Sequence, residues 1–172
     1  METGINRSFL FKLLLVSLIL MVVLPFYTNA QAGKTNFSGS WVINEAKSNL
    51  GDGPRMGGGD FTAKQDGNLL TVERTFTNRD GESVTSLMKY TLDGKESLNT
   101  SQRGDSKSVA NWSADGKTLT ISTSRTFNMN GETMTMQSVE VWTMTDPKTI
   151  NIQSTMTTPN GERKLTMVYD KK

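Results

Sequence analysis

The sequence has no histidine and no cysteine, and these two absences exclude several kinds of functional site. Without cysteine the chain cannot form a disulfide or use a thiol nucleophile. Without histidine it cannot build a Ser-His-Asp triad or a histidine-ligated haem, and zinc sites of the Cys/His type are excluded as well. An enzyme would have to take its acid, base or nucleophile from carboxylates, lysine, tyrosine, serine or threonine.

A large excess of charge of either sign is also missing. The chain has 19 lysines and arginines against 17 aspartates and glutamates, and without residues 1–30 the two numbers are 17 and 16. Proteins that bind nucleic acids use a positive excess to neutralise the phosphates. We therefore expect no nucleic-acid partner.

Residues 1–30 have the pattern of a secretory signal peptide. Two basic residues precede an apolar run from Leu13 to Phe26, and the small residues that follow allow cleavage after Ala30 or Ala32. What remains, residues 33–172, has the size of a single domain. We expect a secreted or periplasmic protein that has no stable membrane span once the signal is removed.

A retained membrane anchor is the alternative interpretation of this segment. The stretch from Phe9 to Phe26 has 18 residues, which is the lower limit for a helix that spans a bilayer. Pro25 and the two cleavage sites favour removal over retention.

The rest of the sequence is divided by turn signals into segments of alternating polarity. Pairs that favour hairpin turns occur at Asp66-Gly67, Asp80-Gly81, Asp93-Gly94, Asp115-Gly116, Asn130-Gly131 and Asn160-Gly161. Between them large apolar residues alternate with threonine and serine, which is typical of half-buried antiparallel strands. We predict ten strands, at 36–44, 60–65, 68–78, 82–92, 95–102, 106–114, 117–128, 132–145, 148–157 and 162–170.

Consecutive strands joined by tight turns predict an all-β fold. We expect an antiparallel up-and-down β-barrel of eight to ten strands, because a long meander removes its free edges by closing. A β-sandwich is the alternative, but the long crossing connections that it needs are missing after residue 60. A short helix is predicted at 45–51, with Asn44 as its N-cap and Gly51 at its end.

The alternation places three charged residues and Tyr90 on the interior side of the predicted barrel. The same-face neighbours are Arg74 with Phe76, Arg125 with Phe127, and Glu140 with Trp142. A charge inside a barrel is costly unless it is paired or hydrated. Either both arginines bind the anionic group of a ligand whose apolar part contacts the three aromatic rings, or one arginine pairs with Glu140 and the other extends to a barrel mouth.

The first strand carries Gly39-Ser-Trp41, which resembles the Gly-x-Trp signature of the calycin superfamily, the lipocalins and fatty-acid-binding proteins. Together with Tyr90-Thr-Leu-Asp-Gly-Lys95 and Val168-Tyr-Asp-Lys171 it is similar to a group of small exported bacterial lipocalin-like proteins of no established activity. The resemblance implies a lipocalin-like barrel in which Trp41 closes one end and Gly39 lets the backbone pass close to it.

The similarity to fatty-acid-binding proteins is more distant. Their last strand has an arginine two residues before a tyrosine, and both residues hold the ligand carboxylate. Here the tyrosine is present as Tyr169, but Met167 occupies the place of the arginine. The resemblance therefore implies Tyr169 as a ligand contact and does not imply the whole carboxylate site.

These observations predict a barrel that binds a small apolar or amphipathic ligand, anionic if the arginines hold it, in a cavity of about 300 Å³ or more. Methionines on the interior faces suit an adaptable cavity, although they would equally fill a packed core. The alternative is a packed barrel that acts as an envelope or secreted interaction protein. A weaker alternative is an isomerase-type enzyme that uses Tyr90 and Glu140. We expect no cofactor and no metal.

Overall fold

The structure of the chain is a computed structural model that describes residues 33–51, 59–77, 81–101, 104–129, 132–158 and 161–172. The predicted signal peptide and its cleavage sites lie outside these residues, and so does the side chain of Phe76. No helix within the described ranges is long and apolar enough to cross a membrane.

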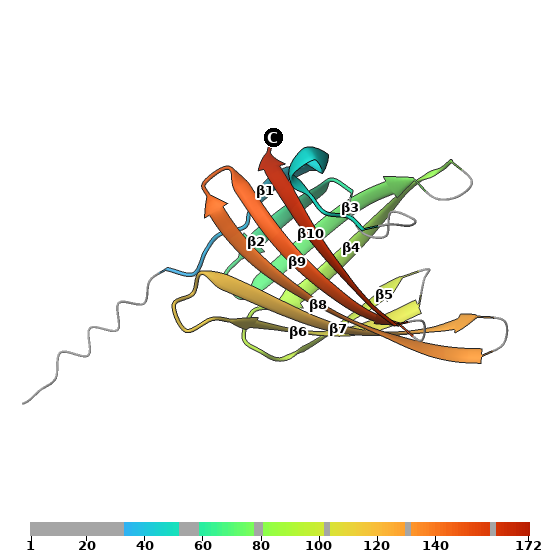
Figure 1. Cartoon of the computed structure of the whole chain (residues 1–172). Helices are drawn as coiled ribbons and strands as arrows, with labels where there is room; N and C mark the ends of the chain where they lie inside the picture. The colour runs from blue at the N-terminus through green and yellow to red at the C-terminus, as the bar shows by residue number, and fades with distance from the viewer. Residues whose placement is uncertain (1–32, 52–58, 78–80, 102–103, 130–131, 159–160) are drawn as a thin grey trace, which may run out of the picture. The chain divides into compact units, whose positions relative to one another are not determined.

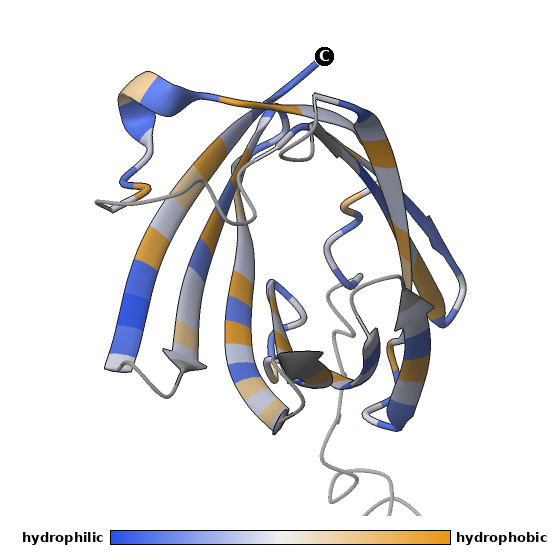
Figure 2. Ribbon diagram, turned by 90° about the vertical axis from the view of Figure 1, so that its right-hand side faces the viewer, coloured by the Kyte–Doolittle hydropathy of each residue, from blue (hydrophilic) through white to orange (hydrophobic). Residues whose placement is uncertain are grey.

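The prediction of an all-β fold with up to ten strands is confirmed (Figure 1). Each predicted segment overlaps one observed strand. The strands are β1 (Gly39–Ile43), β2 (Phe61–Asp66), β3 (Leu69–Thr77), β4 (Ser83–Thr91), β5 (Glu96–Ser101), β6 (Gly104–Trp112), β7 (Thr118–Met129), β8 (Glu132–Asp146), β9 (Thr149–Thr158) and β10 (Gly161–Lys171). Hydrophobic and hydrophilic residues alternate along them, as Figure 2 shows.

All ten strands belong to one antiparallel sheet with the order β4-β3-β2-β1-β10-β9-β8-β7-β6-β5. Strands that follow each other in the chain are neighbours in the sheet, apart from β4 and β5, which form the two ends of the sheet order. In addition, β1 pairs with β10, with Trp41 opposite Lys171. This pairing joins the two ends of the domain and curls the sheet into a nearly closed barrel, as the up-and-down prediction requires.

The ends of the sheet order, β4 and β5, are joined by side chains in place of a backbone ladder. The carboxamide of Asn99 accepts a hydrogen bond from the Lys89 N–H at 2.8 Å and donates one to the Lys89 carbonyl at 3.0 Å. The hydroxyl of Ser97 accepts from the Thr91 N–H at 2.8 Å. Two polar side chains of β5 thus satisfy backbone groups of β4 that would otherwise remain unpaired. We call this junction the β4–β5 seam.

The predicted helix is present as a single 3₁₀ turn, η1 (Glu45–Lys47), and its predicted end at Gly51 is wrong. The N-cap is Asn44 as expected, and its side-chain oxygen accepts from the Lys47 N–H at 3.1 Å. The turn ends at Ser48, because Asn49 exchanges backbone hydrogen bonds with Thr166 of β10 and is drawn into an extended conformation.

One end of the barrel interior is filled by aromatic side chains. Trp41 is 1% exposed, its Nε1 donates to the Phe37 carbonyl at 3.0 Å, and its ring lies 6.5 Å from that of Phe61. Phe61 also contacts Trp142 and Tyr169, with ring centroids 5.3 Å and 4.8 Å away. Burial of each such side chain stabilises the fold by about 1.5–3 kcal/mol. We call this aromatic cluster the packed end.

Gly39 permits the close approach that the Gly-x-Trp resemblance implies. Its φ is +148°, in the region that favours glycine, and a Cβ built on it would lie 2.8 Å from Cε of Lys171. That lysine extends over Trp41, with its Nζ 5.4 Å from the ring centroid. Glycine therefore leaves room for a residue of the last strand to cover the tryptophan.

Candidate functional site

The inner face of the barrel changes from apolar to polar with distance from the packed end. Residues that lie opposite each other on adjacent strands face the same side of a sheet, so the register of β7, β8 and β9 defines rows across the interior. Three successive rows, starting from the packed end, are Leu119–Trp142–Ile152, Ile121–Glu140–Ser154 and Thr123–Ser138–Met156. The first row is fully buried, and the later rows carry a carboxylate and several hydroxyls.

A charged pair marks the boundary between the two regions. Nη2 of Arg74, on β3, lies 3.5 Å from Oε2 of Glu140, on β8. The same oxygen accepts a hydrogen bond from Nε1 of Trp142 at 2.9 Å. The guanidinium also lies 5.3 Å from the ring centroid of Phe61 and 5.9 Å from that of Trp142, within the range of cation–π attraction.

The pair is shielded by the barrel wall but remains in contact with solvent. The side chains of Arg74 and Glu140 are 19% and 23% exposed although both face the interior, so water reaches this level of the barrel. Burial disfavours the charged form of Arg74, but Glu140, together with Tyr169 and Tyr90, more than offsets this effect, so the pKa of Arg74 is raised. The arginine is therefore charged and compensated by Glu140.

Arg125, on β7, faces the same interior without such compensation. Its cross-strand neighbours are Ser106 on β6 and Met136 on β8. Its Nε is buried and has no hydrogen-bond partner, and within the described part of the chain no carboxylate forms an ion pair with it. The two arginines, which the sequence presents in identical Arg-Thr-Phe triplets, thus have different electrostatic surroundings.

Tyr90, on β4, is buried and lies opposite Leu70 of β3, on the interior side of the sheet. Burial raises the pKa of Tyr90 well above its usual value, and Glu140 adds to this, while Arg74 and Arg125 act in the opposite direction. The hydroxyl stays protonated, and no hydrogen bond joins it to any other described residue. It is therefore an interior hydrogen-bonding group that the described part of the chain does not use.

The remaining predicted contacts occupy different environments. Tyr169 lies in the packed end, where its hydroxyl donates to Sδ of Met167 at 3.6 Å and burial raises the pKa of the phenol. Trp142 is also fully buried there. Phe127 is half-buried on β7 opposite Met134, farther from the packed end than Arg125. The predicted contact by Phe76 falls on a side chain outside the described residues.

The site residues predicted from the sequence did not include several serines that face the barrel interior. Ser86 lies opposite Arg74, Ser154 opposite Glu140, and Ser138 opposite Met156. None of the three hydroxyls has a hydrogen-bond partner among the described residues. These serines follow the same alternation that places Arg74 and Glu140 inside. Their positions in the strand pattern could therefore have predicted that they face the interior.

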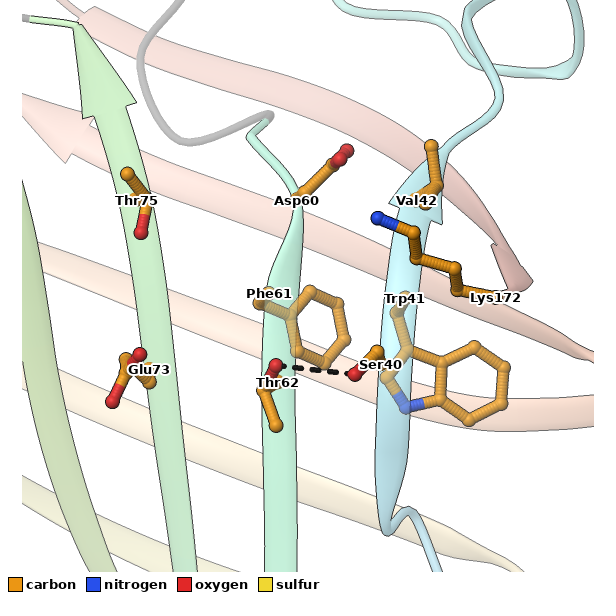
Figure 3. A pocket seen from close by; sticks show the side chains of 9 residues that line it. All are labelled: Ser40, Trp41, Val42, Asp60, Phe61, Thr62, Glu73, Thr75 and Lys172. Carbon is orange, nitrogen blue, oxygen red and sulfur yellow. Dashed lines mark hydrogen bonds between the residues drawn. The ribbon is translucent and has the colours of Figure 1, made fainter. Parts of the chain in front are cut away.

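A small pocket lies on the outer face of the barrel, across β1, β2 and β3 (Figure 3). Its volume is about 160 Å³, and its lining includes the outward side chains of Ser40, Thr62 and Glu73. Ser40 and Thr62 hydrogen-bond each other at 3.3 Å across it. This volume is below the range of about 300–1,000 Å³ that is usual for ligand sites. Among the described residues no group of acidic side chains is arranged to hold a metal ion.

The sequence of the chain has little similarity to the sequences of the known proteins with which it was compared. No protein-family model matches the chain, and no curated protein matches it. Among solved structures, the chain is similar to the zebrafish ileal bile acid-binding protein complexed with cholic acid. The TM-score is 0.49 with 18% sequence identity, and the match covers 79% of this chain and 98% of that chain.

Proposed function

We propose that the barrel, after export, binds a small amphipathic anion in its interior. The observation that carries the proposal is the uncompensated guanidinium of Arg125, whose buried Nε has no partner. A shielded positive charge of this kind is unfavourable unless an anion or water satisfies it. A carboxylate or another oxyanion would supply charge-assisted hydrogen bonds, which are among the strongest available to a protein.

The arrangement of the neighbouring charges supports one anionic group per ligand. Glu140 already neutralises Arg74 at 3.5 Å, which leaves a single positive charge at Arg125. The Tyr90 hydroxyl, which has no hydrogen-bond partner among the described residues, is a further interior donor. A dianion would face Glu140 with an excess of negative charge.

The apolar part of the ligand has room only away from the packed end. Leu119, Trp142 and Ile152 are fully buried, so the inner face at that end is already covered. At the level of Arg125 and beyond it the inward residues are half-buried: Met136 lies opposite Arg125, and Phe127 and Met134 lie farther from the packed end. Flexible thioethers beside an aromatic ring form a surface that adapts to apolar groups of different shape.

The same contacts support binding without catalysis. Glu140 is engaged by both Arg74 and Trp142, so it is poorly placed to act as a mobile base. The raised pKa of Tyr90 keeps its phenol protonated near neutral pH. A proton-transfer site would need a base whose pKa lies nearer the working pH.

Calorimetric titration with dodecanoate tests the proposal. Arg125→Met should weaken binding by about ten-fold or more, because a hydrogen bond to a charged group contributes roughly 1.5–3 kcal/mol. Lys107→Met is the matched control, since it removes one positive charge from an outer-face side chain that is 65% exposed. Equal affinity of wild type and Arg125→Met, or no binding by the wild type, would contradict the proposal.

A further inference from the structure

We infer that the head group of the ligand carries several hydroxyls as well as its negative charge, with Arg125 holding the charge and inward serines holding the hydroxyls. The inference rests on the proposed function and specifies its ligand class. That class is a single-chain amphiphile with an anionic, polyhydroxylated head group, such as a uronic acid glycoside.

The first argument is the number of free hydrogen-bonding groups at one level of the barrel. Ser154 is cross-strand to Glu140, and Ser86 is cross-strand to Arg74, so both serines flank the charged pair. Ser138 lies one row farther from the packed end. Within the described residues these three hydroxyls have no hydrogen-bond partner, so they remain available to a ligand.

The second argument is that the neighbouring interior hydroxyls of β6 and β7 are already satisfied. The hydroxyls of Ser108 and Thr123 share a hydrogen bond of 2.8 Å, and the Ser106 hydroxyl donates to the Asn99 carbonyl at 3.3 Å. These residues are part of the protein's own network. The free serines therefore stand out against neighbours of the same type whose hydrogen bonds are internal.

The third argument concerns what an ordinary fatty acid would do in the same place. Its carboxylate would lie at Arg125 and its alkyl chain beyond it, so it would displace water from the free serine hydroxyls without offering them a partner. Covering a polar group in this way costs free energy, because the group loses water and gains nothing in exchange. A head group with its own hydroxyls replaces the lost water and places the alkyl chain beyond Arg125, beside Phe127 and Met134.

Three probes with the same eight-carbon tail separate charge from hydroxyls. Octyl β-D-glucuronide has both features, nonanoate has only the charge, and octyl β-D-glucoside has only the hydroxyls. Calorimetry on the wild-type protein should show the glucuronide binding about ten-fold or more tightly than either of the others. If the glucuronide binds no more tightly than nonanoate, the inference is overturned.

Serine variants test which groups hold the hydroxyls. Ser138→Ala and Ser154→Ala should each weaken glucuronide binding by about three- to ten-fold and leave nonanoate binding unchanged. Ser122→Ala is the control, because Ser122 is exposed on β7 and its side chain faces away from the interior. Equal losses for both probes would show a structural effect and overturn the assignment, and thermal unfolding of each variant checks that the barrel is intact.

The outcomes distinguish this inference from the proposed function. Nonanoate binding that depends on Arg125, without any advantage for the glucuronide, refutes the hydroxyl-rich head group and leaves the anion site in place. Failure of both anions to bind the wild-type protein refutes both. Arg125→Met should weaken glucuronide binding but not glucoside binding, and the opposite pattern would overturn the role given to Arg125.

Discussion

The single carboxylate of Glu140 gives the two interior arginines different roles. It lies 3.5 Å from Arg74, and Trp142 holds the same oxygen in place with a hydrogen bond of 2.9 Å. Arg74 is thereby part of the barrel's own structure. Arg125 keeps its charge and is available to a ligand. A substitution at either arginine therefore has a different consequence, although both residues begin the same triplet.

A double-mutant cycle on Arg74 and Glu140 should reveal this difference. Glu140→Gln should lower the free energy of unfolding by about 1–3 kcal/mol, less than for a fully buried pair because both side chains are partly hydrated. The two substitutions Glu140→Gln and Arg74→Met should be coupled by about 1 kcal/mol in urea unfolding. Strictly additive effects would show that the contact contributes nothing to stability.

Trp41 provides the residue-scale test of the packed end. Trp41→Ala removes a side chain that is 1% exposed together with its hydrogen bond to Phe37. The free energy of unfolding should therefore fall by about 3–5 kcal/mol. Chemical denaturation measures the loss. A change below about 1 kcal/mol would mean that the ring contributes little to the core.

At the scale of elements, side chains hold the β4–β5 seam in place of a backbone ladder. Asn99→Ala removes an acceptor for the Lys89 N–H and a donor to the Lys89 carbonyl. It should lower the free energy of unfolding by about 1–3 kcal/mol. The Lys89 amide should also exchange faster with deuterium. Asn99→Asp should have an intermediate effect, because a carboxylate accepts but cannot donate.

A matched control for the seam is available on the next strand. Asn111→Ala, on β6, changes the same residue type at an exposed position that pairs with Thr120 in the β6–β7 ladder. It should leave exchange at Lys89 unchanged. If Asn99→Ala behaves like this control, water or the neighbouring Ser97 must hold the seam instead.

For the whole molecule, three exposed carboxyl groups predict how stability depends on pH. The Lys95 side chain holds the pKa of Asp93 below its ordinary 3.8, the Ser113 hydroxyl does so for Asp115, and the Asn44 amide does so for Asp170. A carboxyl group whose pKa is lower in the folded state stabilises it above the unfolded pKa, and this contribution is lost as pH falls through the folded pKa.

The midpoint of urea unfolding should therefore stay constant near neutral pH and fall below about pH 4. Asp115→Asn, which cannot ionise, should make the fall shallower. A midpoint that is the same at pH 6 and pH 3 would show that these hydrogen bonds do not favour the ionised forms.

Export is a second prediction for the whole molecule, and we propose it from the leader sequence alone. N-terminal sequencing of the exported protein should begin at Gln31 or Gly33, because small residues precede both positions. Recovery of the intact leader in the membrane fraction would support a retained anchor instead.

Much of this architecture could be predicted because alternation along a strand is a local property. It placed Trp142 and Glu140 on one side of β8 without knowledge of any neighbour. The pairing of Glu140 with Arg74 and not Arg125 could not be predicted, because it depends on how β3 and β8 face each other across the barrel. The β4–β5 seam could not be predicted either, because the Asn99 side chain takes the place of a backbone ladder only when β4 and β5 are separated in the sheet. Helix η1 ends early because of β10, which is distant in sequence.

The pairing of β1 with β10 has a consequence for how the chain reaches this fold. Trp41 pairs with Lys171, so the contact that closes the barrel joins residues 130 positions apart. Contacts of such long range are slow to form, because the entropy of closing a large loop is lost before any stabilising contact forms. During synthesis β1 has no partner on that side until β10 has been translated. The barrel of a nascent chain with this topology therefore stays open until all ten strands have been made.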